Sequence, residues 1–249
     1  MDYRDFLWAA AEQSAREFGC AAEDFLRPGF SAFASRVTEG ARVYCRQPFL
    51  FEAVTYGPSV VVSCREDLLP GARELLGQCD RPYDLFEPAG LSAVNRLLSG
   101  NGGSVRFASH CFLPDPEAVS AFRGECPGEV RILGPEGFAP YYSETFSNAL
   151  CEKRREYDRL AAGAFDGERL VGLAGISEDC PELWQLGIDV VPEYRGRGIG
   201  PALVNRLTRE VLGMGKIPFY GASWANVRSL KTAERAGYRM AWTAFSAGF

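Results

Sequence analysis

The segment VPEYRGRGIGPALV, residues 191–204, places three glycines and two arginines in six positions directly ahead of an apolar run with helical spacing. A helix start exposes unpaired backbone N–H groups and the positive end of the peptide dipoles, so it can hold an anion where side chains leave room. The glycines leave that room, and the arginines add positive charge. The segment therefore predicts a phosphate site, and a pyrophosphate is its natural ligand.

Three known kinds of glycine-rich turn are alternatives for this segment: a Rossmann fingerprint, a Walker loop and a plain turn. A Rossmann fingerprint needs a glycine at position 201, which is proline, and a Walker loop needs a Gly-Lys-Ser or Gly-Lys-Thr that the chain lacks here. A plain strand-to-helix turn with incidental arginines is the third. What the residues do satisfy is the pattern R-x-x-G-x-G, through Arg195, Gly198 and Gly200.

With this pattern, VVPEYRGRGIGPALVNRL resembles the acyl-CoA-binding segment of the GNAT N-acyltransferase superfamily. Downstream, ANVRSLKTAERAGYR at 225–239 is similar to a later motif of the family, an asparagine followed three residues on by a serine or alanine and then by a glycine-aromatic pair. The resemblance covers about residues 129–249. It implies an α/β (α+β) fold, a mixed sheet flanked by helices.

The resemblance also implies how acetyl-CoA, or another acyl-CoA, is held. Backbone amides of the glycine turn would hold the pyrophosphate, and the main chain at the end of the preceding strand would pair with the pantetheine arm and polarise the thioester carbonyl. Asn226 would bond the pantetheine, with a helix N-cap as its structural alternative, and Ser229 would lie near the sulfur. The implied cofactor-binding residues are Val190, Val191, Arg195, Gly196, Arg197, Gly198, Ile199, Gly200, Asn226 and Ser229.

Two catalytic groups that many family members carry are replaced in this chain. A tyrosine that protonates the departing thiolate would stand at Ala233, and a glutamate that serves as the base would stand at Trp184. We expect Asp189, and second Glu182, as the base, because a general base must lie within reach of the proton it takes. A purely structural role for Asp189 fits the sequence equally well. Ser229, a water or another tyrosine would then serve as the acid.

Four aromatic residues near the expected cleft could line a pocket for the acceptor substrate, and a place in the core is the alternative for each. They are Trp184, Trp224, Tyr141 and Tyr142.

Composition and charge limit the kinds of partner that we expect. The net charge of −5 and the pI near 5.2 give no general attraction to nucleic acid or to an anionic membrane, and no stretch approaches the roughly 20 apolar residues of a membrane span. The eight cysteines show no metal-ligand spacing and the chain has one histidine, His110, in a predicted strand, so we expect no metal. With no secretory signal at its start, the sequence favours a reducing cytoplasm.

A change in composition divides the sequence near 114–128, where prolines and glycines accumulate. We therefore expect an N-terminal α/β domain at 1–125, which is a degenerate relative of the same fold, a wall of the acceptor site or a homodimerisation surface, and a GNAT-like domain at 126–249. Hydrophobic periodicity predicts N-terminal helices at 5–18, 65–77 and 89–99 and strands at 41–47, 50–56, 59–64 and 104–113. In the second half it predicts strands at 129–133, 158–165, 169–177, 183–191, 217–223 and 238–245, and helices at 143–156, 199–212 and 226–236.

The function that these observations favour is direct transfer of an acetyl group from acetyl-CoA to the amine of a small molecule. A non-catalytic acyl-CoA-binding sensor or ligand-sequestering module is the alternative, because Ala233 and Trp184 stand where acid and base are usual.

Overall fold

The computed structural model describes residues 2–45 and 47–249. Contacts divide them into two compact units, each assembled from separate stretches of the chain. Unit 1 holds the chain up to Phe6, Phe112–Ala222 and Asn226–Met240, and unit 2 holds Leu7–Cys111, Ser223–Ala225 and Ala241–Phe249. A domain boundary at 125/126 stays a prediction; the two contact units alternate along the sequence.

The sheet of unit 1 has the strand order β9-β8-β7-β6-β5. The strands β5 to β8 pair antiparallel in sequence, and β9 adds to β8 in parallel. A parallel pair requires a crossover, which helix α7 provides. The bounds are β5 Glu129–Leu133, β6 Asp158–Asp166, β7 Arg169–Ser177, β8 Leu183–Val190, α7 Ile199–Gly213, β9 Ile217–Ser223 and α8 Val227–Arg235.

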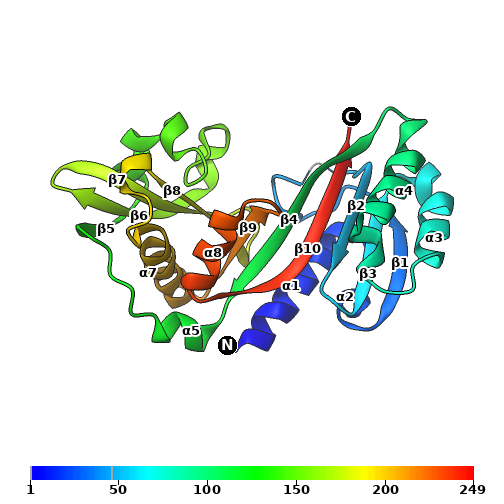
Figure 1. Cartoon of the computed structure of the whole chain (residues 1–249), viewed down its shortest axis with the longest axis horizontal. Coiled ribbons are helices and arrows are strands. Elements are labelled where there is room, and N and C mark those ends of the chain that lie inside the picture. The colour runs from blue at the N-terminus through cyan, green and yellow to red at the C-terminus, as the bar shows by residue number, and fades with distance from the viewer. Residues whose placement is uncertain (1, 46) are drawn as a thin grey trace. The chain divides into compact units, whose positions relative to one another are not determined.

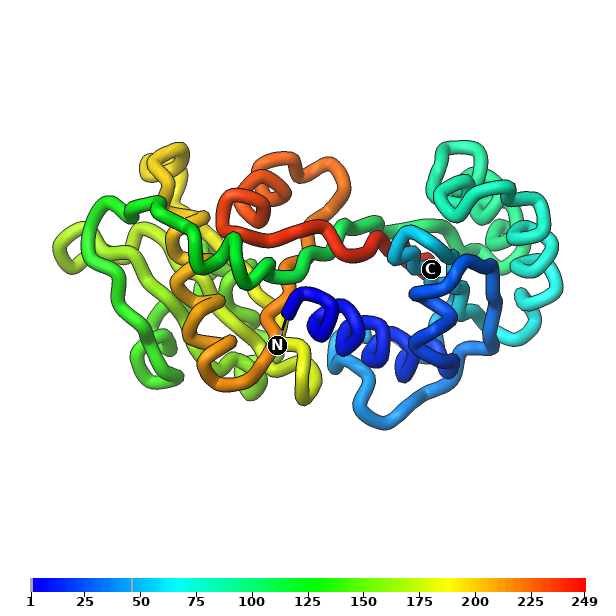
Figure 2. Tube along the Cα trace, turned by 90° about the horizontal axis from the view of Figure 1, so that it is seen from below, coloured from blue at the N-terminus to red at the C-terminus, as the bar shows by residue number. Residues whose placement is uncertain are grey.

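Both faces of this sheet are covered, as the nearly continuous burial of β6 and β7 shows. Helix α7 packs on one face (Figures 1 and 2), where a Cβ on Gly172 would lie 2.8 Å from Ile199. On the other face a Cβ on Gly175 or Gly187 would collide with the backbone at Ala149 or Asn148. The segment 134–157 therefore lies directly on these strands, and glycine allows that close approach.

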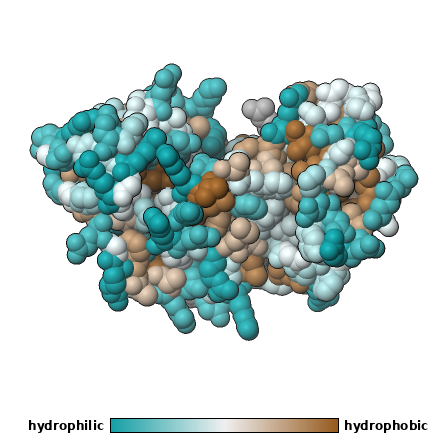
Figure 3. Space-filling model, viewed as in Figure 1, coloured by the Kyte–Doolittle hydropathy of each residue, from teal (hydrophilic) through white to brown (hydrophobic). Residues whose placement is uncertain are grey.

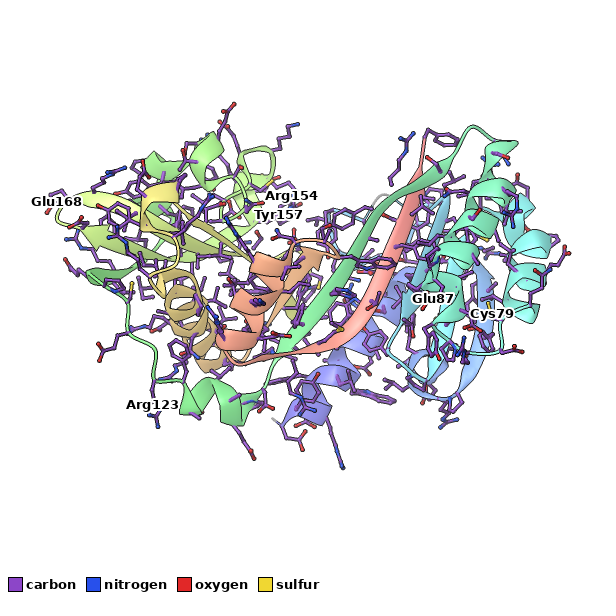
Figure 4. All side chains as sticks on the ribbon, in the orientation of Figure 1. Cys79, Glu87, Arg123, Arg154, Tyr157 and Glu168 are labelled. Atoms are coloured by element: carbon purple, nitrogen blue, oxygen red, sulfur yellow. The ribbon has the colours of Figure 1, made fainter. Side chains whose placement is uncertain are left out.

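The predicted helix at 143–156 is wrong. The structure has a short helix α6 at Pro135–Phe138 and 3-10 turns at Ala139–Tyr141, Glu144–Phe146 and Glu152–Tyr157, with Arg154 in a non-helical conformation. Backbone N–H groups of this segment donate to carboxylates on the strands instead of to helical carbonyls. Asp189 accepts from the amides of Asn148 and Ala149, and Asp158 accepts from the amide of Cys151. These tertiary hydrogen bonds replace the helical ladder. In Figure 4 the labelled Arg154 and Tyr157 lie in the last of these turns, and Glu168 lies at the end of the β6–β7 hairpin.

The sheet of unit 2 has the order β1-β3-β2-β10-β4, in which β1 and β3 are parallel and β2 pairs antiparallel with both β3 and β10. Apolar residues of α3 and α4, including Leu76 and Leu98, pack with Phe51, Val62 and Phe245 of the strands. The bounds are α1 Tyr3–Phe18, α2 Glu23–Leu26, β1 Gly29–Ala34, β2 Phe51–Thr55, β3 Ser59–Cys64, α3 Leu69–Gly77, α4 Pro88–Ser99, β4 Ser104–Pro114 and β10 Tyr238–Gly248.

The strand predicted at 41–47 is also wrong, since none of its described residues lies in a strand. Glu17 of α1, which is 1% exposed, accepts hydrogen bonds from the backbone and guanidinium of Arg42, and the Gln47 side chain bonds the Glu17 carbonyl. Side-chain bonds to α1, rather than a strand ladder, hold this segment. The sequence patterns did not reveal α2, β1 or α5 (Pro116–Ala121).

The predicted fold class, a mixed α/β sheet flanked by helices, is confirmed. The view in Figure 3 is largely hydrophilic, with scattered apolar side chains.

Candidate functional site

The glycine turn connects β8 to α7 in the left-handed conformations that glycine favours. Gly196 has φ +78° and Gly198, the N-cap of α7, has φ +86°. Within residues 2–45 and 47–249, the amides of Gly196, Arg197 and Gly198 donate to no protein acceptor, and Gly198 has no side chain to cap the helix. The 15-residue helix α7 thus begins with unpaired N–H groups and with the positive end of its dipole. These features fit a pyrophosphate.

The two arginines of the turn are held by the surrounding backbone. Arg195 donates from Nε to the Val190 carbonyl at 2.9 Å, and Arg197 donates to the Glu193 carbonyl at 3.0 Å. The Arg197 guanidinium also lies 5.0 Å from the centre of the Tyr194 ring, whose hydroxyl donates to Asp166. Both arginines are exposed, so the turn presents two positive charges to solvent.

The strands β8 and β9 separate beside this turn. Their parallel pairing runs from Leu183 and Ile217 to Leu186 and Tyr220 and stops there, although β8 continues to Val190. The last four residues of β8 therefore present a strand edge that β9 does not occupy. An extended ligand can add to such an edge as a further strand.

The predicted contacts at Val190 and Val191 lie at the end of that edge. The Val191 amide donates to Val171 of β7, so the peptide groups of Val190 face the opposite, open edge. The Val190 carbonyl there accepts the Arg195 side chain, as noted above. A pantetheine contact at these residues stays a prediction.

The start of α8 lies beside the point where β9 separates from β8. Asn226 is its N-cap, and its Oδ1 accepts the Ser229 amide at 3.2 Å, so its capping role is confirmed. The Ser229 hydroxyl lies 2.7 Å from the hydroxyl of Tyr220. Burial raises the pKa of Tyr220 above its usual range, and its hydrogen bond to Ser229 opposes that rise. Tyr220 is not among the residues predicted from the sequence, because nothing in its spacing shows that it reaches Ser229.

The position where many relatives have a catalytic tyrosine, Ala233, is completely buried in the core. Tyr238, in the glycine-aromatic pair, is buried too, and its hydroxyl pairs with Thr208 at 2.7 Å. Neither residue places an accessible hydroxyl where β8 and β9 separate.

The first candidate base, Asp189, already accepts three hydrogen bonds. Its Oδ2 bonds the amides of Asn148 and Ala149, at 2.8 and 3.0 Å, and its Oδ1 bonds the Asn148 side chain at 2.7 Å. The carboxylate anchors the 146–150 segment to β8. This supports the structural alternative for Asp189, and its role as a base stays a prediction.

The second candidate base, Glu182, lies just before β8, at the opposite end of the strand from the glycine turn. Eight strand residues span roughly 25 Å at about 3.3 Å per residue. Glu182 is exposed and pairs with Lys216 at 3.5 Å. The structure does not bring it together with Ser229 or Asn226.

Trp184 lies on the α7 face of the sheet. Alternation along β8 puts its side chain on the same face as Val190, which packs beside Gly172 and helix α7, whereas Asp189 lies on the other face. The indole is 7% exposed and its N–H has no hydrogen-bond partner within the described residues. Its surroundings favour the core alternative.

The other three predicted acceptor-site aromatics are also packed. The Tyr142 hydroxyl donates to the buried Asp158, and burial, together with this hydrogen bond, raises the Tyr142 pKa. Tyr141 packs edge-on against Phe146 and Phe165. Trp224 belongs to unit 2, where it stacks on His110. A role in acceptor binding stays a prediction for all four.

Among residues 2–45 and 47–249, no cluster of histidine, cysteine or acidic side chains could hold a metal ion, and no helix is long and apolar enough to cross a membrane. None of the eight cysteines, all of which lie in the described part of the chain, forms a disulfide. His110 bonds Thr243 at 3.0 Å, and burial lowers its pKa. Two surface hollows of about 490 and 700 Å³ are lined by residues 30–96 of unit 2.

Three solved structures that match the chain have low sequence identity to it. A GNAT-family protein from Novosphingobium aromaticivorans is 26% identical over 59% of this chain and 67% of its own, with a TM-score of 0.44. A GCN5-related N-acetyltransferase-like protein from Streptococcus suis is 17% identical over 65% of this chain and 69% of its own, with a TM-score of 0.46. An aminoglycoside N-acetyltransferase in complex with CoA is 16% identical over 45% of this chain and 88% of its own, with a TM-score of 0.37.

None of the curated proteins matches the chain. The family model that does match is that of the acetyltransferase (GNAT) family, and the match covers the strands β5 to β9, the glycine turn and α8. Residues 129–238 of this chain are therefore a GNAT acetyltransferase domain.

Proposed function

We propose that unit 1 transfers an acetyl group from acetyl-CoA to the amine of a small molecule. The observation that carries this proposal is the open edge of β8 beside a glycine turn in which the amides of residues 196–198 donate to no acceptor among the described residues. The turn would hold the pyrophosphate, and the edge of β8 would hold the pantetheine arm. Acetyl-CoA supplies the activated acyl group; the chain supplies binding, orientation and electrostatic stabilisation.

Positioning accounts for much of such a reaction. A neutral amine attacks a thioester directly once the two are held together, so no covalent enzyme intermediate is required. Backbone N–H groups at the open edge of β8 are suited to polarise the thioester carbonyl. The acidic balance of the chain favours a cationic amine as the acceptor. We expect the chain to act in the cytoplasm, with the N-terminal half walling the acceptor site or mediating a homodimer.

Calorimetric titration with acetyl-CoA tests the cofactor assignment. We expect micromolar binding by the wild type and a loss of at least about 10-fold in the Arg195→Ala, Arg197→Ala double variant, since charge-assisted hydrogen bonds are the strong ones. Arg206→Ala is the matched control, because Arg206 lies on α7 and pairs with Glu210 at 2.9 Å. Thermal unfolding must be compared as well, because Arg195 also bonds Val190.

Turnover is then measured by mass spectrometry of acetylated products over a panel of amines. Binding with turnover supports the enzyme. Binding without turnover on a broad panel supports the non-catalytic sensor instead. If the folded protein does not bind acetyl-CoA, both the enzyme and the sensor are contradicted.

A further inference from the structure

Two hydroxyl groups meet where β9 separates from β8. Tyr220 is the last residue of β9 that pairs with β8, opposite Leu186, and Ser229 is the third residue of α8. Their oxygens are 2.7 Å apart. Tyr220 and Ser229 come from different elements of unit 1, and their contact joins the end of the paired sheet to the start of the helix.

The two hydroxyl groups differ in exposure. Tyr220 is 2% exposed, and its ring packs edge-on against Phe112 and Tyr238. Ser229 is partly exposed, and the N-cap Asn226 fixes its amide. The Tyr220 hydroxyl is therefore held rigidly in the core, and the serine is the member of the pair that a ligand can reach.

The phenol of Tyr220 keeps its proton at neutral pH. Burial is the largest cause of its raised pKa, the negative charge of Asp189 acts in the same direction, and the bond to Ser229 opposes them. When this phenol donates to the Ser229 oxygen, the serine proton is free to point elsewhere. Ala233 places no hydroxyl one turn later on α8.

We propose that Tyr220 is a positioning residue that fixes the Ser229 hydroxyl as a hydrogen-bond donor to the sulfur of bound acetyl-CoA. This inference rests on the proposed acetyl transfer. When the nitrogen–carbon bond forms and the carbon–sulfur bond breaks, the electron pair of the broken bond passes to sulfur and the amine proton leaves to solvent. The Ser229 hydrogen bond stabilises the thiolate that results.

The test measures the pKa of the thiol of bound CoA and requires no acceptor. The ultraviolet absorbance of the thiolate is followed against pH, and the complex with desulfo-CoA is subtracted to remove the signals of protein cysteines and tyrosines. Tyr220→Phe keeps the ring and removes the hydroxyl, Ser229→Ala removes the donor, and Tyr238→Phe is the control, because that hydroxyl bonds Thr208 in the core.

We expect each of the first two variants to raise the bound thiol pKa by roughly one unit, because a hydrogen bond to the charged form is lost. The double variant should shift no further than Ser229→Ala, and Tyr238→Phe should not shift. Additive shifts, or no shift in Tyr220→Phe, overturn the inference while CoA binding stands. Absence of CoA binding by the wild type overturns the proposed function instead. If Tyr220→Phe does not fold, an unchanged thiol pKa in Ser229→Ala overturns the inference.

Discussion

At Gly198 the backbone has a positive φ that residues with a Cβ rarely adopt. A Cβ there would also lie 3.4 Å from the Glu125 carbonyl oxygen. This single residue sets the direction in which the chain enters α7 and keeps the start of the helix open. The glycine at position 198 is therefore required by the backbone conformation of the turn.

We expect Gly198→Ala to lower the free energy of unfolding by about 1–2 kcal/mol, the cost of placing a Cβ in the left-handed region. Acetyl-CoA affinity should fall as well, because the turn must rearrange. Chemical denaturation and calorimetry measure the two effects. Gly77→Ala at the end of α3 is the control, since that glycine lacks a positive φ and has open space around it. Equal stability of the two variants would contradict the strain argument.

A second residue-scale prediction concerns Glu52 of β2. Burial raises its pKa to about 8, Glu17 adds to that rise, and Arg42 opposes it. Between about pH 4.5 and about 8 the folded chain therefore holds a proton that the unfolded chain has lost, so stability falls as pH rises through this window.

Glu52→Gln cannot titrate at this position, so the free energy of unfolding should fall less in the variant over the same pH window. The difference between the two proteins should be about 1–3 kcal/mol, after allowance for the partial exposure of Glu52. Urea unfolding of both proteins at about pH 5, about pH 6.5 and about pH 8 measures this difference. Parallel pH profiles would show that Glu52 is ionised in the folded state.

At the scale of elements, Asp189 joins β8 to the 146–150 segment. Its three hydrogen bonds replace part of the helix that the sequence pattern predicts there. Its carboxylate therefore does structural work whatever its part in catalysis, and the two roles make different predictions.

We expect Asp189→Asn to lower the free energy of unfolding by about 1–3 kcal/mol, because the amide group cannot accept all three bonds. Thermal and urea unfolding measure this loss. Glu182→Gln is the control, since Glu182 makes an exposed pair that is worth little. If Asp189 is also the base, the folded variant will bind acetyl-CoA but lose most of its turnover; retained turnover together with lost stability assigns Asp189 to structure alone.

At the scale of the whole molecule, the two contact units exchange segments of chain. Helix α5 belongs to unit 1, where the buried Asn205 side chain bonds the Val119 carbonyl at 3.0 Å and the Asp115 amide bonds Gly237. The end of β10 belongs to unit 2, where Thr243–Ala247 pair with β2.

A fragment of residues 126–249 should therefore not fold cooperatively. It lacks α5, which leaves buried polar groups unpaired, and it lacks the strand that pairs with β10. Circular dichroism during thermal unfolding tests this, with the full chain as the control. A sharp transition in the fragment would show that 126–249 is an autonomous domain, as the composition change suggests.

Local patterns predicted much of unit 1. The apolar runs at 158–165 and 169–177 predicted β6 and β7, and Gly167 in the short turn between them has a positive φ. The apolar spacing after Gly200 predicted α7, and Asn226 predicted the start of α8. The end of α7 was less exact: the helix includes Gly213, and Gly215, with φ +76°, terminates it.

The sequence by itself determined the glycine turn, the order of strands and helices after residue 158 and the GNAT resemblance that the family model finds at 129–238, because each depends on residues close together in the chain. The tertiary structure alone decided the fate of 41–47 and 143–156, where Glu17, Asp158 and Asp189 bond backbone from distant positions. It alone paired Tyr220 with Ser229 and buried Trp184 in the core. Such contacts depend on which strands become neighbours, and hydrophobic periodicity contains no information about that choice.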